Sequence, residues 1–103
     1  MVLLEFSISP LEKGSSVSEY VARCLRIVDA SGLDYQLHAM GTIVEGELDQ
    51  LLDLLKRCFA ELEGDCERIT CTAKFDSRRG YKGRLESKVT SVEEKVGRKL
   101  GKG

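Results

Sequence analysis

Thr42 and Glu45, in the segment 37–47, carry a hydroxyl and a carboxylate, which are groups that hold small polar ligands. Glu45 stands in an apolar, strand-like run, so its carboxylate needs a partner to offset the cost of burial. Two explanations are open for Glu45. It binds a ligand that offers paired donors or a positive charge, or it forms a salt bridge with a neighbouring strand or subunit.

Alternation along a strand places Thr42 and Glu45, three residues apart, on opposite faces. The two side chains therefore share a pocket only if the hairpin is twisted or bulged, which Gly41 permits. Thr42 is equally consistent with an ordinary β-branched strand residue.

Other candidates are less specific. Ser7 and Ser9 line either a pocket or an interface. His38 is the single histidine, and no serine, cysteine or acidic partner stands at a recognisable catalytic spacing from it. The sequence contains no nucleophile elbow, Walker loop or dinucleotide-binding glycine motif. We therefore expect no catalytic residues.

The four cysteines, at positions 24, 58, 66 and 71, form no Cys-x-x-Cys pair. Zinc sites need closer pairing of ligands, so we expect no metal site. Cys24 and Cys58 fall on the apolar faces of two predicted helices, where cysteine behaves as a small buried hydrophobe. This use of cysteine fits a reducing compartment.

Charge is unevenly distributed along the chain. Residues 78–103 carry a net charge of +6 and residues 1–77 a net charge of −7. A basic C-terminal segment of this kind binds an anion or nucleic acid, or is a solvated helix face or a tail that docks on an acidic neighbouring subunit. We favour the solvated helix face or docking tail over binding of an anion or nucleic acid, because no aromatic side chains are interleaved with the charges to stack on bases.

The apolar pattern predicts the elements that position these residues. Strands are expected at 2–9, 34–39, 42–45 and 68–76, with a turn at Met40–Gly41. Amphipathic helices are expected to start at Ser16 with a capping box to Glu19, to follow Gly46–Glu47, and to run from Leu85 to about Leu100. Gly32 is expected to stop the first helix in a left-handed conformation, and Gly64 closes the second.

This order predicts a single α+β domain over residues 1–103. Two split β-α-β units give a ferredoxin-like sandwich, in which a four-stranded antiparallel sheet carries two helices on one face, plus a C-terminal helix. No apolar run reaches the roughly 20 residues that a membrane span requires, and the N-terminus lacks a basic signal-peptide region. We expect a cytoplasmic protein.

The open sheet face is expected to be polar, with Glu5, Ser7, Ser9, Thr70, Thr72 and Lys74 on it. It lacks the aromatic platforms of RNA-recognition modules of this fold, which argues against nucleic acid as a partner. The narrow apolar stripe of the third helix is suited to a subunit contact. We therefore expect a closed symmetric oligomer.

The run Tyr35-x-Leu37-x-x-Met40-Gly41-Thr42-x-x-Glu45-Gly46-Glu47, with Ser7-x-Ser9-Pro10 before it, resembles the thiamine-binding protein family. This family, part of the YkoF-like superfamily, includes small uncharacterised proteins of the UPF0045 type. The resemblance also covers Lys74-x-Asp76-x-Arg78 and Lys88-Val89-x-Ser91-Val92, and so nearly the whole chain.

The resemblance implies a ferredoxin-like fold, assembly as a homotetramer that is a dimer of dimers, and no catalytic reaction. It also implies that thiamine or its hydroxymethylpyrimidine part is bound in a pocket near a subunit contact. Carried over by position, Thr42 and Glu45 are the leading ligand-binding residues, and Gly41, Ser7, Ser9 and Tyr35 are secondary ones.

The leading hypothesis from the sequence is thus a non-enzymatic cytosolic binding protein for a thiamine-like heterocycle. Two alternatives stay open. One is a structural or regulatory homotetramer without a small-molecule ligand, in which Glu45 pairs across an interface. The other is an anion binder that uses the basic C-terminal segment.

Overall fold

The computed structural model describes residues 1–80 and 83–101. Its elements follow the order β1 (Val2–Pro10), α1 (Val17–Ala30), β2 (Asp34–His38), β3 (Gly41–Gly46), α2 (Leu48–Glu63), β4 (Ile69–Ser77) and α3 (Arg84–Val96), with a 3₁₀ turn at Gly14–Ser16 before α1. The strands form one antiparallel sheet in the order β2-β3-β1-β4. The predicted α+β ferredoxin-like sandwich is confirmed.

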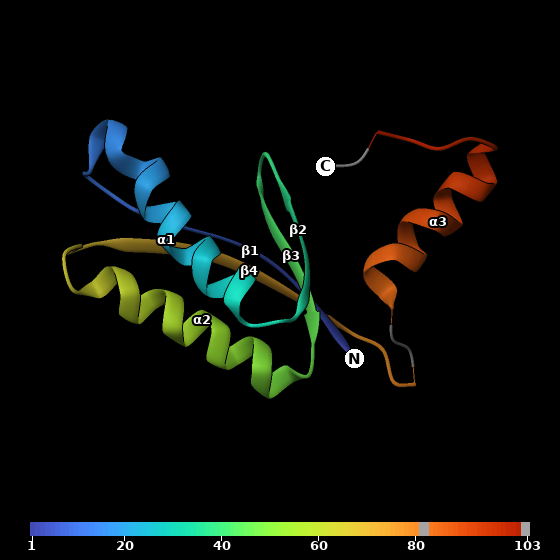
Figure 1. Ribbon diagram of the computed structural model, residues 1–103, viewed down its shortest axis with the longest axis horizontal. Coiled ribbons are helices and arrows are strands. Elements are labelled where there is room, and N and C mark those ends of the chain that lie inside the picture. The colour runs from blue at the N-terminus through green and yellow to red at the C-terminus, as the bar shows by residue number, and fades with distance from the viewer. Residues whose placement is uncertain (81–82, 102–103) are drawn as a thin grey trace.

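Helices α1 and α2 lie side by side on one face of the sheet, as Figure 1 shows. The core between them is built from alternate residues of β1, which point toward the helices (Val2, Leu4, Phe6 and Ile8), and from the apolar stripes of both helices. Cys24 and Cys58 meet in this core and are fully buried, as expected from their positions on the helices.

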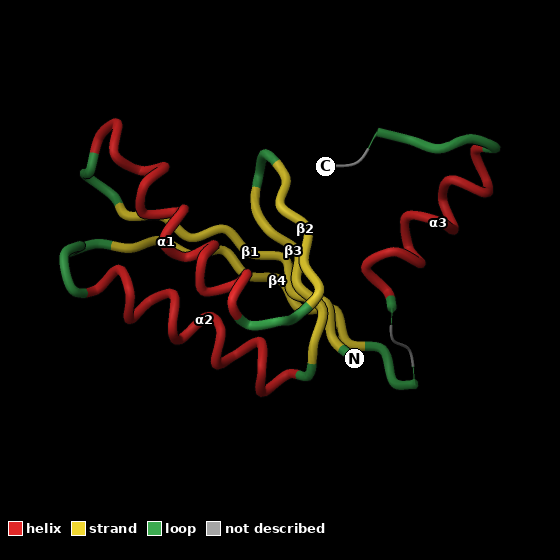
Figure 2. The backbone as a smooth tube through the Cα atoms, in the orientation of Figure 1, coloured by secondary structure: helices red, strands yellow, loops and turns green. Residues whose placement is uncertain are grey.

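Helix α3 stands apart from the other two helices, near the end of the sheet that carries the N-terminus (Figure 2). Its first residues contact β2 and β3. Leu85 is buried there, whereas Val92 and Val96 are about half exposed, so the apolar stripe of α3 is mostly uncovered within one chain. Tyr81 and Lys82, in the predicted loop before α3, lie outside the described residues.

The expected capping box at the start of the first helix needs correction. Ser16 precedes α1, but its side chain makes no capping hydrogen bond, because Ser16 belongs to the 3₁₀ turn and lacks the extended backbone that capping requires. A capping box is present at the start of α2. The Glu47 side chain accepts from the main-chain N–H of Gln50, and Gln50 Oε1 accepts from the main-chain N–H of Glu47.

The ends of several elements also shift by one or a few residues. β2 ends at His38, so the turn falls at Ala39–Met40, and β4 runs one residue further toward the C-terminus than expected. Gly32 has a φ of +77° and stops α1 in the left-handed conformation, as predicted.

Candidate functional site

Strand β1 is longer than its neighbour β3, and this difference creates a cavity. The pairing of β1 with β3 ends at Phe6 opposite Thr42, whereas the pairing of β1 with β4 continues to Pro10 opposite Ile69. Beyond Phe6, therefore, the β3 side of β1 has no neighbouring strand in the part of the chain that the structure describes. The β2–β3 turn stops short there, and α1 passes over the gap.

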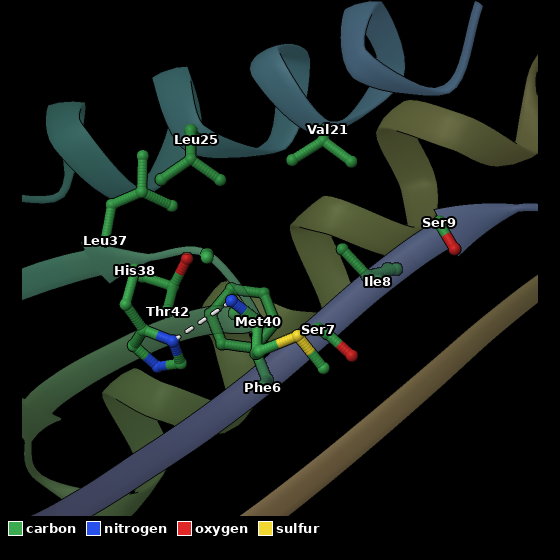
Figure 3. Close-up of a pocket in the computed structure, with 12 residues that line it drawn as sticks. Phe6, Ser7, Ile8, Ser9, Val21, Leu25, Leu37, His38, Met40 and Thr42 are labelled. Atoms are coloured by element: carbon green, nitrogen blue, oxygen red, sulfur yellow. Dashed lines mark hydrogen bonds between the residues drawn. The ribbon is translucent and has the colours of Figure 1, made fainter. Parts of the chain in front are cut away.

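We call this space the hairpin cavity (Figure 3). Its volume is about 290 Å³. Val21 and Leu25 of α1 form one wall, and the hairpin tip forms another. The full lining is Phe6, Ser7, Ile8, Ser9, Val21, Leu25, Leu37, His38, Ala39, Met40, Gly41 and Thr42.

Thr42 is the buried polar side chain of this lining. The residue is 2% exposed, and it lies on the helix-facing side of β3, opposite Phe6. No hydrogen bond of its hydroxyl to another described residue is present. A hydroxyl carries one donor and two acceptor positions, so this group is available to a molecule in the cavity.

Gly41 sets the hairpin against β1. Its φ of +155° is one that residues with side chains rarely adopt, and a Cβ built there would lie 2.7 Å from the carbonyl oxygen of Phe6. The close approach of the two main chains thus requires glycine. Gly41 belongs to the cavity as a determinant of its shape.

The hairpin tip is held by His38. The main-chain N–H of Met40 donates to His38 Nδ1 at 3.2 Å. His38 Nε2 is buried without a hydrogen-bond partner among the described residues, and the nearest acid oxygen, Glu5 Oε2, is 3.7 Å away. Met40 itself is 85% exposed at the mouth of the cavity.

Ser7 and Ser9 line the hairpin cavity, but not with their hydroxyls. They alternate with the core residues Phe6 and Ile8, and their side chains project from β1 away from α1 (Figure 3). The contribution of Ser7 and Ser9 to this cavity is therefore their main chain. Tyr35, in turn, packs against the core and its hydroxyl donates to Asp29 Oδ1 at 2.9 Å.

Glu45 lies on the opposite face of β3 from Thr42, as strand alternation predicted. The register of β3 with both neighbours is unbroken, so no bulge brings the two side chains together. Glu45 lines a second cavity of about 240 Å³, whose full lining is Asp34, Tyr35, Gln36, Glu45, Gly83, Leu85 and Glu86. We call it the α3 cavity.

The carboxylate of Glu45 is engaged by helix α3. It is 4% exposed and accepts from the main-chain N–H of Arg84 at 2.9 Å and from that of Leu85 at 3.5 Å. These are the first two N–H groups of α3, which have no partner inside the helix. A carboxylate at this position also interacts favourably with the helix dipole. Glu45 thus caps α3 from a neighbouring strand.

A second anchor of α3 is Asp76 at the end of β4. Its carboxylate contacts Lys88 Nζ at 2.7 Å and Arg84 Nη2 at 2.8 Å, and the Asp76 carbonyl accepts from Arg84 Nη1 at 2.8 Å. The ammonium of Lys88, followed by the Arg84 guanidinium, lowers the pKa of Asp76 from 3.8 to about 2. Two cations of the basic C-terminal segment are therefore used inside the molecule.

The apolar walls and the hairpin tip are the part of the cavity that the sequence analysis missed. Val21 and Leu25 read as ordinary core positions of a helix, and Met40 as a turn residue. The sequence offered one signal for the cavity, the unequal lengths of two predicted strands. The first strand was predicted with eight residues, and its neighbour in the sheet, the third strand, with four. The unequal lengths leave part of β1 without a partner.

Two further observations concern metal binding and membrane spans. Among residues 1–80 and 83–101, no cluster of three or more His, Cys, Asp or Glu side chains is arranged to hold a metal ion. In the same described part, none of the helices has both the length and the apolar character needed to cross a membrane.

Comparison with known proteins places this geometry in a family. Residues 4–93 match the family model described as "Thiamine-binding protein". A UPF0045 protein of Methanocaldococcus jannaschii is 34% identical over 93 residues, which cover 90% of this chain and 93% of that protein. A UPF0045 protein of Bacillus subtilis is 35% identical over 98 residues, covering 89% and 94% of the two chains.

Solved structures agree with this placement. A hypothetical protein of Methanocaldococcus jannaschii superposes with a TM-score of 0.82 at 34% identity, over 90% of this chain and 96% of that one. A Thermotoga maritima protein proposed to act in thiamine biosynthesis or salvage superposes with a TM-score of 0.79 over 88% and 97% of the chains. At 23% identity, this second likeness concerns the fold alone. By sequence and by structure, the chain belongs to the thiamine-binding protein family.

Proposed function

We propose that this protein binds thiamine or its hydroxymethylpyrimidine part in the hairpin cavity without transforming it. The observation that carries the proposal is the buried Thr42 hydroxyl, which has no partner in the described structure and opens into a cavity with apolar walls. Small-molecule sites combine such walls with a few placed polar groups. The family description supports the choice of ligand.

The proposal includes that the protein binds its ligand without catalysing a reaction on it. Of the described residues that line the cavity, His38 alone is titratable, and one of its nitrogens is engaged by the Met40 N–H. The hydroxyls of Ser7 and Ser9 point to the other face of the sheet. General acid–base or covalent catalysis needs a second positioned group within hydrogen-bond reach. This lining supports binding rather than chemistry.

The proposal gives Thr42 and Glu45 different roles. Thr42 contacts the ligand, whereas Glu45 stabilises the start of α3 on the other face of the sheet. A ligand-binding role for Glu45 would require the ligand to displace two main-chain N–H groups from its carboxylate. That exchange would leave the first turn of α3 without its cap.

We further propose that the protein is a cytoplasmic homotetramer, a dimer of dimers. Two surfaces support an assembly. The outer edge of β4 has no neighbouring strand in the described structure, and Phe75 on this strand is 38% exposed. The apolar residues Val92 and Val96 of α3 are also uncovered. Leu37 and Met40, exposed at the cavity mouth, are positioned for a second subunit to complete the pocket.

Isothermal titration calorimetry with thiamine tests the assignment. We expect Thr42→Val, which keeps the shape and removes the hydroxyl, to weaken thiamine binding about tenfold, as the loss of one buried hydrogen bond predicts. Thr72→Val is the matched control, because Thr72 is an exposed strand residue outside the cavity. Its affinity should equal that of the unmodified protein.

The same titration with Glu45→Gln separates the two candidate residues. We expect an unchanged affinity for thiamine. A large loss in Glu45→Gln together with an unchanged Thr42→Val would move the site to the α3 cavity. No heat for the unmodified protein with either thiamine or hydroxymethylpyrimidine would contradict the proposed function.

A further inference from the structure

In the unpaired stretch of β1, the register determines to which side each residue directs its main-chain N–H and C=O groups. The N–H of Leu11 donates to the carbonyl of Arg68 at 2.8 Å, so Leu11 directs its main chain toward β4. Main-chain groups of successive strand residues point to alternate sides. Ser9 and Ser7 therefore also direct their N–H and C=O groups to β4, and Ile8 directs its groups to the β3 side.

The close approach at Gly41 supports this assignment. The Phe6 carbonyl oxygen lies 2.7 Å from a Cβ built on Gly41, so Phe6, two residues before Ile8, directs its carbonyl to β3. Phe6 pairs with Thr42, and this is the last pair between β1 and β3 at the end of β3 that faces the hairpin turn. Ile8 has no opposite residue on β3, and no other described residue bonds to its main chain.

Ile8 consequently presents one donor and one acceptor, side by side, to the hairpin cavity. Pro10, the next residue with this orientation, has no N–H and adds an acceptor alone. The free edge spans Ser7–Pro10, which is shorter than a typical strand of about five or six residues. This length suits a small planar molecule better than an added peptide strand.

We propose that the cavity recognises its ligand through the main chain of Ile8. It then selects planar heterocycles that carry a ring nitrogen next to an exocyclic amino group. The Ile8 N–H donates to the ring nitrogen and the Ile8 carbonyl accepts from the amino group. This inference rests on the proposed function, since the 4-aminopyrimidine ring of thiamine has this pattern of acceptor and donor.

The surroundings of Ile8 fit a flat ring. A ring that continues the plane of the sheet beyond the end of β3 is covered on the helix side by Val21 and Leu25. The Thr42 hydroxyl closes the end of the space toward β3. Paired main-chain contacts of this kind discriminate strongly, because an analogue with the wrong groups leaves buried polar atoms without partners.

Ligand analogues and the Ile8 amide test this directly. Oxythiamine has thiamine's shape but carries an N–H and an oxo group where thiamine has the ring nitrogen and the amino group. The oxythiamine ring could match the Ile8 carbonyl and N–H only in a flipped orientation. That orientation would place the bulky thiazolium arm at the wrong end of the cavity. We expect oxythiamine to bind at least about tenfold more weakly than thiamine. Pyrithiamine, which keeps the aminopyrimidine and changes the other ring, should bind within about threefold of thiamine.

Nuclear magnetic resonance of protein labelled with ¹⁵N-isoleucine provides the second readout. Saturating thiamine should shift the Ile8 amide proton downfield and slow its hydrogen exchange at least about tenfold. The Ile69 amide on β4 serves as the reference within the same sample. Equal affinities for thiamine and oxythiamine, or an Ile8 amide that thiamine does not change, would overturn this inference while the proposed function stands. Absence of thiamine binding would instead overturn the proposed function.

Discussion

At the residue scale, strand alternation decides what each candidate side chain can do. It separates Thr42 from Glu45, and it turns the hydroxyls of Ser7 and Ser9 away from the hairpin cavity. The sequence predicts these faces, because period two is readable without a structure. It does not predict that Glu45 finds its partners in the main chain of Arg84, 39 residues further along the chain.

Gly41 offers a stability test at this scale. Gly41→Ala places a methyl group against the Phe6 carbonyl at an unfavourable φ, and we expect a loss of about 1–3 kcal/mol in the free energy of unfolding. Chemical denaturation measures this change. Gly64→Ala is the matched control, since Gly64 has helical φ and nothing within 4 Å of a built Cβ. It should be neutral or stabilising by up to about 1 kcal/mol. Equal effects of the two changes would contradict the role assigned to Gly41.

At the scale of elements, α3 is held by contacts from two strands rather than by its own apolar stripe. Glu45 of β3 caps its first turn, and Asp76 of β4 binds Arg84 and Lys88. The amphipathic pattern predicts the helix itself. It cannot predict the docking, because each anchoring contact joins residues that lie apart in sequence and depends on the sheet register.

Removing the cap should loosen α3. We expect Glu45→Ala to reduce protection of the Arg84 and Leu85 amides from hydrogen exchange and to lower the free energy of unfolding by about 1–3 kcal/mol. Asp34→Asn, at the exposed cross-strand neighbour of Glu45, is the control and should change neither quantity. Full retention of amide protection in Glu45→Ala would refute the capping role.

The Asp76 anchor should depend on pH. Because the folded-state pKa of Asp76 is lowered from 3.8 to about 2, its contribution is complete above pH 4 and is lost as the pH falls through 2. Carboxyl ¹³C resonances report the titration of Asp76. In Lys88→Met, which removes the main cause of the shift, the titration midpoint should rise toward 3.8. An unchanged midpoint in that variant would show that Lys88 does not set the pKa.

At the scale of the whole molecule, the element order and the alternating strand faces were sufficient to predict the ferredoxin-like sandwich. The hairpin cavity was not predictable in the same way, because it arises from a difference in length between β1 and β3 and from the path of α1 above it. Helix positions such as Val21 and Leu25 carry no sign, in sequence, that they border a cavity instead of the core.

The proposed assembly gives a mass that light scattering can measure. We expect a particle of four 11.4-kDa chains in solution. Replacing Val92 and Val96, the exposed apolar residues of α3, by glutamate should reduce the mass, because the new charges oppose a subunit contact through this face. Glutamate at the exposed position Ser91 is the control. A monomer for the unmodified protein would exclude a pocket completed by a second subunit.

The most direct test of the central claim is to map where thiamine binds by amide chemical shifts. Titration of uniformly ¹⁵N-labelled protein should perturb Ile8, Val21, Leu25 and Thr42 most strongly, since these residues surround the hairpin cavity. Amides around the α3 cavity, such as those of Gln36 and Leu85, should shift far less. Perturbations centred on Glu45 and the start of α3, with Ile8 and Thr42 unchanged, would contradict the assignment of the ligand site to the hairpin cavity.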